Sequence, residues 1–290
     1  MIESSPSAQD PQALDIESQA NFEGNDGVLL MERVNNPVIK AQIVDVLYRK
    51  ELLEAERINK LVFTPFSSPE LKHLTCFKDQ HGVVYTSKNP NYNPGNYIPS
   101  TREEIEKELI ESIERVSSVT DISFSSEEPT ENFVPVNWKM PWTSEKPTPK
   151  QMSIIEAHEK GHSIRPYASL WDHFSKGFDP SKIEYTDRDF EMDVLTRNTS
   201  EHNQSVNMEE MKANVLEYLF SGPEVAERMS QLKNYFGMNG SEQFTKGHLD
   251  YARTHYVTDT GMDNRMTHFF QAITPETEAA FLELINSSGI

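Results

Sequence analysis

Residues 148–165 read TPKQMSIIEAHEKGHSIR, and the rest of the chain is interpreted outward from this stretch. Its start predicts a helix, because Thr148 can act as N-cap, Pro149 suits the first helical position and Gln151 can complete a capping box. The stretch also carries apolar residues for a packing face, at positions 154, 155, 157 and 164. We therefore expect one amphipathic helix over 148–165.

The same stretch contains the pattern H-E-x-x-H. His158 and His162 are four residues apart, so on a helix they share one face and two imidazoles can meet one metal ion. Glu159 lies beside them, where it can polarise a metal-bound water. Gly161 leaves room for a neighbouring chain. We interpret the stretch as a zinc site; the alternative is two surface histidines on an amphipathic helix.

Two histidines do not complete a catalytic zinc site, which needs a third protein ligand and an open position for water. The helix expected over 208–220 contains Glu210-x-x-Ala213-Asn214. This pattern resembles the second motif of the gluzincins, which are metallopeptidases with H-E-x-x-H and a glutamate as third ligand. The resemblance implies that Glu210 binds zinc and that Asn214, on the same helix face, orients a ligand histidine. The competing ligands are Glu209 and Glu217, followed by Glu184, Glu191, His202 and the 248–268 cluster.

The gluzincin resemblance also implies a Tyr or His, downstream of the ligands, that stabilises the oxyanion. The helix expected over 245–256 offers three such residues on one stripe, and two more candidates follow it: His248, Tyr251 and His255, then Arg265 and His268. Tyr251 and His255 are our catalytic candidates. The alternative for each is a surface or packing residue.

Other catalytic patterns fit less well. A metzincin would have a glycine and a third histidine where Arg165 and Ala168 stand. The sequence contains neither a Walker loop nor a dinucleotide-binding glycine fingerprint. Cys76 is the single cysteine, and we expect it to be a buried structural thiol.

The composition of the chain restricts the cellular compartment and the binding partners that we expect. The formal net charge of −19 disfavours nucleic-acid binding, so a peptide or protein is the expected substrate. No apolar run is long enough to span a membrane, and no signal peptide is visible. A single cysteine fits a reducing compartment, so we expect a cytoplasmic protein. The sequence does not indicate an oligomeric state.

Three regions are expected along the chain. Residues 1–27 are polar and predict a disordered lead-in. Residues 28–147 predict helices near 28–61 and 100–116 and short strands at 62–64, 83–86, 122–125 and 133–138. Residues 148–290 predict a helical zinc-site region, and 28–290 can form one domain. Within it, an amphipathic helix is expected over 224–236, with Val225, Met229, Leu232, Tyr235 and Phe236 facing inward. By analogy with zinc peptidases we expect an α+β, mainly helical, zincin-like fold with a small sheet beside the metal-site helix.

These features predict a zinc-dependent metallopeptidase, with Zn²⁺ held by His158, His162 and Glu210. Glu159 would act as general base toward a zinc-activated water. Two alternatives stay open. One is a non-catalytic binding or regulatory protein with a structural or degenerate zinc site, and the other is a zinc hydrolase of a non-peptide amide.

Overall fold

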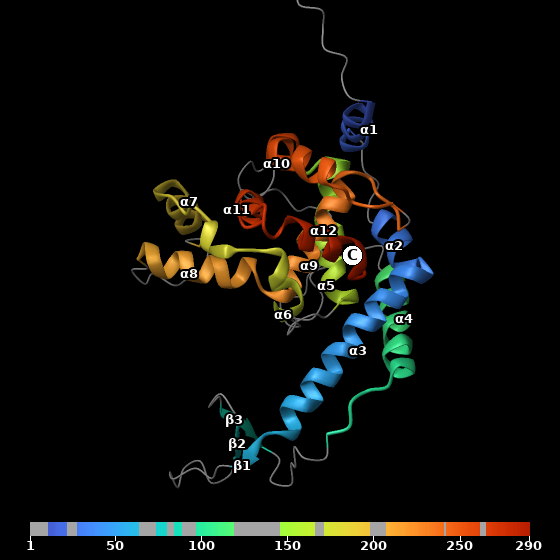
Figure 1. Ribbon diagram of the computed structural model, residues 1–290, viewed down its shortest axis with the longest axis vertical. Helices are drawn as coiled ribbons and strands as arrows, with labels where there is room; N and C mark the ends of the chain where they lie inside the picture. The colour runs from blue at the N-terminus through green and yellow to red at the C-terminus, as the bar shows by residue number, and fades with distance from the viewer. Residues whose placement is uncertain are drawn as a thin grey trace, which may run out of the picture. The chain divides into compact units, whose positions relative to one another are not determined.

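Helices make up most of the described residues, and one small sheet accompanies them (Figure 1). The computed structural model describes residues 11–21, 28–63, 74–79, 84–88, 97–118, 146–165, 171–197, 207–240, 242–261 and 265–290. The helices before the metal-site stretch are α1 (Pro11–Ala20), α2 (Val28–Asn35), α3 (Pro37–Asn59) and α4 (Arg102–Ser118). The later ones are α5 (Pro149–Ile164), α6 (Trp171–Phe174), α7 (Asp187–Arg197), α8 (Met208–Leu219), α9 (Gly222–Tyr235), α10 (Lys246–Thr260), α11 (Arg265–Gln271) and α12 (Glu278–Ser287). Two 3-10 helices, η3 (Ser175–Gly177) and η4 (Pro180–Lys182), follow α6.

The described residues divide into two compact units, and the boundary crosses α3 and α4. The smaller unit comprises Val44–Glu108, and the larger one contains the described residues on either side of it. The expected division at residue 147 therefore differs from the observed one. A long helix can contribute to two units, and sequence periodicity does not reveal such a division.

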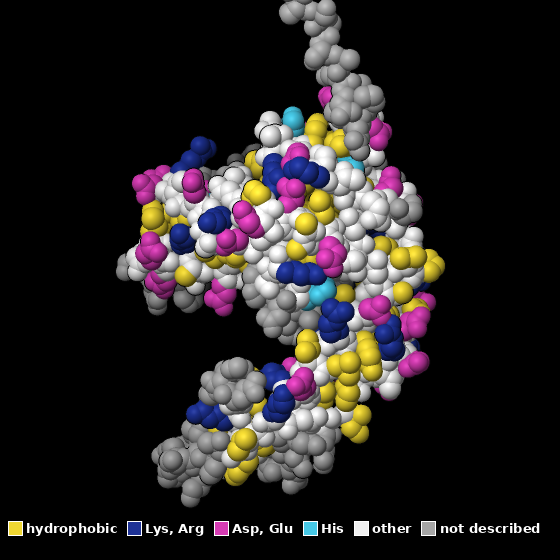
Figure 2. All heavy atoms as spheres, in the orientation of Figure 1, with side chains coloured by type: hydrophobic (Ala, Val, Ile, Leu, Met, Phe, Trp, Pro, Cys, Tyr) yellow, Lys and Arg dark blue, Asp and Glu magenta, His cyan; other side chains and the backbone are white. Residues whose placement is uncertain are grey.

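The smaller unit contains the sheet, an antiparallel arrangement of β1 (Val62–Phe63), β2 (Thr75–Lys78) and β3 (Val84–Ser87) with β2 in the middle. Strands near 62–64 and 83–86 were expected, whereas β2 was not. Cys76 is buried on β2, in keeping with a structural thiol. Apolar side chains also lie exposed on this unit (yellow in Figure 2), among them Leu53, Val62 and Phe63.

The expected sheet beside the metal-site helix is not found among the described strands. All three belong to the smaller unit, whereas α5 belongs to the larger one. The strands expected at 122–125 and 133–138 lie outside the described residues. The fold is therefore α+β in the broad sense, with mainly helical structure and a three-stranded antiparallel sheet.

Helix α9 is the centre of the larger unit, because every residue in it except Pro223 is buried. Its apolar positions pack as expected: Val225, Met229, Leu232 and Tyr235 are fully buried. Its polar positions are also buried, and buried polar groups need partners. Asn234, for example, donates to the Ser153 carbonyl on α5 at 2.9 Å and accepts from Arg33 on α2.

The N-terminal helix α1 was not expected, because residues 1–27 predict disorder. Ile16 and Ala20 are buried, and α1 packs on α10. The Gln19 side chain lies 2.7 Å from Nε2 of His248, and the Nζ of Lys150 donates to the carbonyl of Ala20. The surface of α10 supplies the apolar contact that α1 lacks by itself.

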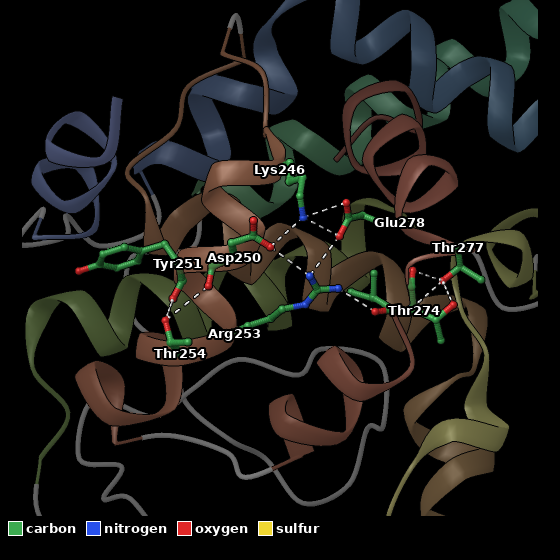
Figure 3. Close-up of polar contacts among 9 residues, drawn as sticks. Lys246, Asp250, Tyr251, Arg253, Thr254, Thr274, Thr277 and Glu278 are labelled. Carbon is green, nitrogen blue, oxygen red and sulfur yellow. Dashed lines mark hydrogen bonds and ion pairs between the residues drawn. The ribbon is translucent and has the colours of Figure 1, made fainter. Parts of the chain in front are cut away.

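The C-terminal helices are joined by an ion-pair network (Figure 3). Lys246 and Arg253 on α10 each lie 3.1 Å from the Glu278 carboxylate on α12, and each also pairs with Asp250. Arg253 donates to the carbonyl of Ile273 at 2.7 Å. The network fixes the approach of α12 to α10. Among the described helices, none combines the length and apolar character needed to cross a membrane.

Candidate metal centre

Helix α5 begins as its sequence predicts. The Thr148 side chain accepts from the Gln151 backbone N–H at 3.2 Å, and the Gln151 side chain accepts from the Thr148 N–H at 2.7 Å. Pro149 occupies the first turn, and the helix ends at Ile164 with Arg165 as C-cap. The helix therefore carries both histidines one turn apart in its second half.

The two histidine side chains meet a glutamate from α9. The Nε2 atoms of His158 and His162 lie 3.1 Å apart, with the ring planes at 89° to one another. Glu224 places one carboxylate oxygen 3.4 Å from Nε2 of His158 and the other 3.3 Å from Nε2 of His162. These three residues are the only described group of at least three His, Cys, Asp or Glu side chains that could hold a metal ion.

The spacing fits zinc. Zinc with tetrahedral bonds of about 2.0–2.1 Å holds its ligand atoms about 3.3–3.4 Å apart. The two Nε2 atoms, 3.1 Å apart, are close to such an edge, and the Glu224 carboxylate spans both rings with one oxygen 3.4 Å from His158 and the other 3.3 Å from His162. A buried oxygen of Glu224, Oε2, has no hydrogen-bond partner, as expected for a ligand atom. The donor set of two imidazoles and one carboxylate is also typical of catalytic zinc.

Charge and burial act against each other at this cluster. Burial raises the pKa of Glu224, but the adjacent His158 and His162 and the charge of Arg228 outweigh it and hold that pKa well below the ordinary value. Burial lowers the pKa of His162, but Glu224 and Glu227 raise it by more, so the pKa of His162 lies above its ordinary value. Ionised Glu224 and the histidines therefore stabilise one another.

Glu159 lies next to these ligands on α5 and is half-buried. Burial raises the pKa of its carboxyl group, an effect that the neighbouring His158 and His162 partly oppose. A carboxylate with a raised pKa accepts protons more readily than an exposed one. This is the property required of a general base.

Glu210 is not brought to the histidines. It lies exposed in the first turn of α8, where its backbone N–H donates to the Asn207 side chain at 2.9 Å. The competing candidates Glu209, Glu217, Glu184 and Glu191 are exposed as well, and His202 lies outside the described residues. The chain turns at 221–223, so it is the next helix, α9, that packs along α5 and presents Glu224.

The expected oxyanion donors also lie elsewhere. The rings of Tyr251 and His255 stack on α10 with centroids 4.1 Å apart, and His255 is exposed. His248 completes the capping box of α10. Arg265 pairs with Asp193 at 3.2 Å, and His268 lies 3.6 Å from Asp189. These contacts of Tyr251, His255, His248 and His268 lie outside the three-residue cluster, whereas the Arg265 guanidinium lies 5.5 Å from the centroid of the Tyr218 ring.

Tyr218 is a residue at the cluster that sequence reasoning missed. Burial and the nearby charge of Glu224 raise the pKa of its hydroxyl group. The residue is nevertheless 45% exposed, so one side of it faces solvent at the edge of the cluster. The sequence did offer one signal for it. Tyr218 lies four residues before Gly222-Pro223-Glu224, a pattern typical of a helix start, so it lies close to Glu224 along the chain.

Comparison of the chain with protein-family models, curated proteins and solved structures found no match. The chemistry of the cluster is therefore argued from its own residues. A residue beside the cluster departs from the gluzincin pattern. In that pattern an Asp or Asn follows the ligand glutamate by four residues. Here Arg228 stands four residues after Glu224, and its guanidinium lies 3.7 Å from the Glu224 carboxylate.

Proposed function

We propose that this protein is a zinc-dependent metallopeptidase in which His158, His162 and Glu224 hold one zinc ion. The observation that carries the proposal is the meeting of three metal-ligating side chains from two packed helices, with neighbouring nitrogen and oxygen atoms 3.1–3.4 Å apart. Such spacing suits a tetrahedral ion and leaves a fourth position for water or substrate.

Glu159 is the proposed general base. Zinc held by His158, His162 and Glu224 would lower the pKa of a bound water and so supply the nucleophile. Glu159 would accept the proton that this water loses and pass it to the departing amine. The Tyr218 hydroxyl, beside Glu224 and partly exposed, is the proposed donor to the developing oxyanion.

Helix α5, with its H-E-x-x-H sequence, still resembles the gluzincins. The proposed third ligand is Glu224 and no longer Glu210. A zincin-like fold also remains part of the proposal. Arg228 in place of the family's Asp or Asn is the main departure from that pattern. A peptide or protein is the proposed substrate.

The test combines zinc content with cleavage of a peptide library by purified protein. We expect about one zinc per chain and measurable cleavage for the wild type. Glu159→Gln should retain zinc and lose activity by orders of magnitude, because it removes the base and leaves the ligands. Tyr218→Phe should retain zinc and lower kcat about 100–1000-fold, the range for loss of an oxyanion donor. Tyr251→Phe is the matched control and should leave kcat unchanged.

A second candidate function is a binding or regulatory protein with a structural zinc site. The observation that favours it is the burial of two ligands, because His158 is 6% and Glu224 is 7% exposed. Zinc retention without cleavage of any library peptide would support this function over the peptidase. Cleavage confined to non-peptide amide substrates would support the third class, an amide hydrolase.

A further inference from the structure

A fully buried ion pair lies next to the proposed metal ligands. Arg165, the C-cap residue of α5, donates from Nε to Glu227 Oε1 at 3.1 Å, and its Nη2 bonds the other oxygen of the same carboxylate. Both side chains have no exposed surface. Arg165 also donates to the Gly289 carbonyl at 2.9 Å. The pair joins the helix that carries His158 and His162 to the helix that carries Glu224.

Glu227 is seated against the backbone of α5 at Gly161. A Cβ atom on Gly161 would lie 1.7 Å from Oε2 of Glu227 and 2.8 Å from Nη2 of Arg165. The carboxylate therefore occupies the space that any larger residue at position 161 would fill. Gly161 directly precedes His162, so this contact lies within the ligand-bearing turn of α5.

Stability by itself does not account for such a pair. A buried ion pair is often no more stabilising than well-packed apolar residues of similar volume, but its charged hydrogen bonds hold a defined geometry. Zinc ligation depends on geometry, since ligand distances vary within about 0.2 Å. Glu227 lies three residues after Glu224, so its position governs where the α9 turn with Glu224 meets α5.

We propose that Glu227, held by Arg165 and seated against Gly161, is a positioning residue that sets the spacing of α5 and α9 at the metal ligands. This inference rests on the proposed zinc site. It assigns the buried pair to metal binding, beyond its contribution to folding. Replacing the pair with apolar residues should then separate metal affinity from stability.

The decisive variant is Arg165→Met/Glu227→Leu. We expect its metal-free form to melt close to the wild-type temperature, because no charge is left buried without a partner. Its zinc affinity, measured by competition with a chromophoric chelator, should fall about 10-fold or more, as for other residues that orient ligands. The d–d absorption of bound Co²⁺ should also change, reporting altered ligand geometry. Zinc affinity within twofold of the wild type, with an unchanged Co²⁺ spectrum, would overturn the inference.

Two further variants keep the test decisive if the double variant does not fold. Glu227→Gln preserves shape and removes only the charge, and we expect the same direction of change in zinc affinity and Co²⁺ spectrum. An unchanged affinity and spectrum in this folded variant would equally refute the positioning role. Glu278→Gln, in the ion-pair network of α10 and α12, should lower the melting temperature without changing zinc affinity.

The outcomes separate this inference from the function on which it rests. Wild-type protein that binds no zinc would overturn both. Wild-type protein that binds zinc and cleaves peptides, together with unchanged affinity in the Glu227 variants, would overturn the positioning role and leave the peptidase proposal intact.

Discussion

Glu224 is the residue that completes the proposed three-ligand site, of which the sequence pattern supplies the two histidines. Its carboxylate spans the two imidazoles, with an oxygen 3.3–3.4 Å from each Nε2 atom. Arg228 lies 3.7 Å from the same carboxylate and, with Tyr218, restricts its orientation. At this scale the chemistry depends on which carboxylate reaches the histidines, and that choice can be tested directly.

The first prediction compares Glu224 with Glu210. Glu224→Ala should reduce zinc affinity at least as strongly as His158→Ala, because each removes one of three ligands. Glu210→Ala should leave the affinity unchanged, since Glu210 is an exposed residue at the start of α8. The measurement is competition with a chromophoric chelator across the three variants. A strong loss in Glu210→Ala with none in Glu224→Ala would restore the assignment made from the gluzincin resemblance.

At the scale of elements, α5 and α9 form the unit that carries the site. The capping box sets where α5 starts, and the turn at 221–223 sets where α9 starts. Asn234 near the end of α9 contacts Ser153 near the start of α5, whereas Glu227 near the start of α9 contacts Arg165 at the end of α5. The two helices therefore run in opposite directions. The close contact at Gly161 is the most sensitive point of this packing.

The second prediction concerns Gly161→Ala. In an exposed helix this change stabilises by up to about 1 kcal/mol. Here we expect destabilisation by about 3–5 kcal/mol, because the new methyl group displaces a buried, paired carboxylate. Chemical denaturation measures the difference. In a Glu227→Ala background the same substitution should add a smaller loss, because the 1.7 Å clash with Glu227 is gone and only the 2.8 Å approach to Arg165 Nη2 remains; a full additional loss would locate the strain elsewhere.

The third prediction concerns docking of α1. Ile16 is 6% exposed, and a Cβ on Gly247 of α10 would lie 2.6 Å from its Cδ1 atom. Ile16→Ala should therefore lower the free energy of unfolding by about 2 kcal/mol. The exposed neighbour Glu17 provides the control, and Glu17→Ala should change stability by less than about 0.5 kcal/mol. Equal melting temperatures for wild type and Ile16→Ala would mean that α1 does not stabilise the fold.

At the scale of the whole larger unit, several cations are enclosed around α9. Lys233 is 2% exposed and donates to the Ile290 carbonyl at 3.0 Å, and Arg33 is fully buried. Burial, together with Arg33 and Arg165, lowers the pKa of Lys233 to about 7. Burial lowers the pKa of Arg33 to about 9, with Arg165 acting in the same direction. These charges connect the stability of the fold to pH.

The fourth prediction follows from Lys233. The unfolded lysine has a pKa near 10.5, so between about pH 7 and 10.5 the unfolded chain binds more protons than the folded one. The destabilisation from burying this charge is therefore complete below pH 7 and decreases as the pH rises. Lys233→Met should be more stable than the wild type at pH 6 by a few kcal/mol, and the difference should shrink toward pH 10. Urea denaturation at several pH values measures it, and a constant difference would refute the shifted pKa.

Several features could be predicted from the sequence because they depend on neighbouring residues. The capping box of α5, the shared face of His158 and His162, and helix α8 all follow from local spacing. The apolar stripe of α9 was also correct, since Val225, Met229 and Leu232 are buried. Local hydrogen bonds and helical periodicity are sufficient to specify such features.

Only the tertiary structure decided the partners of those elements. Glu224, Glu227 and Arg228 read as solvent-facing charges in an acidic chain, yet all three are buried because α9 is enclosed on every side. For the same reason residues 11–20 form a helix only where α10 offers them an apolar surface. A long-range contact depends on which helices pack together, and spacing along one helix carries no information about the charge that another helix will bring to it.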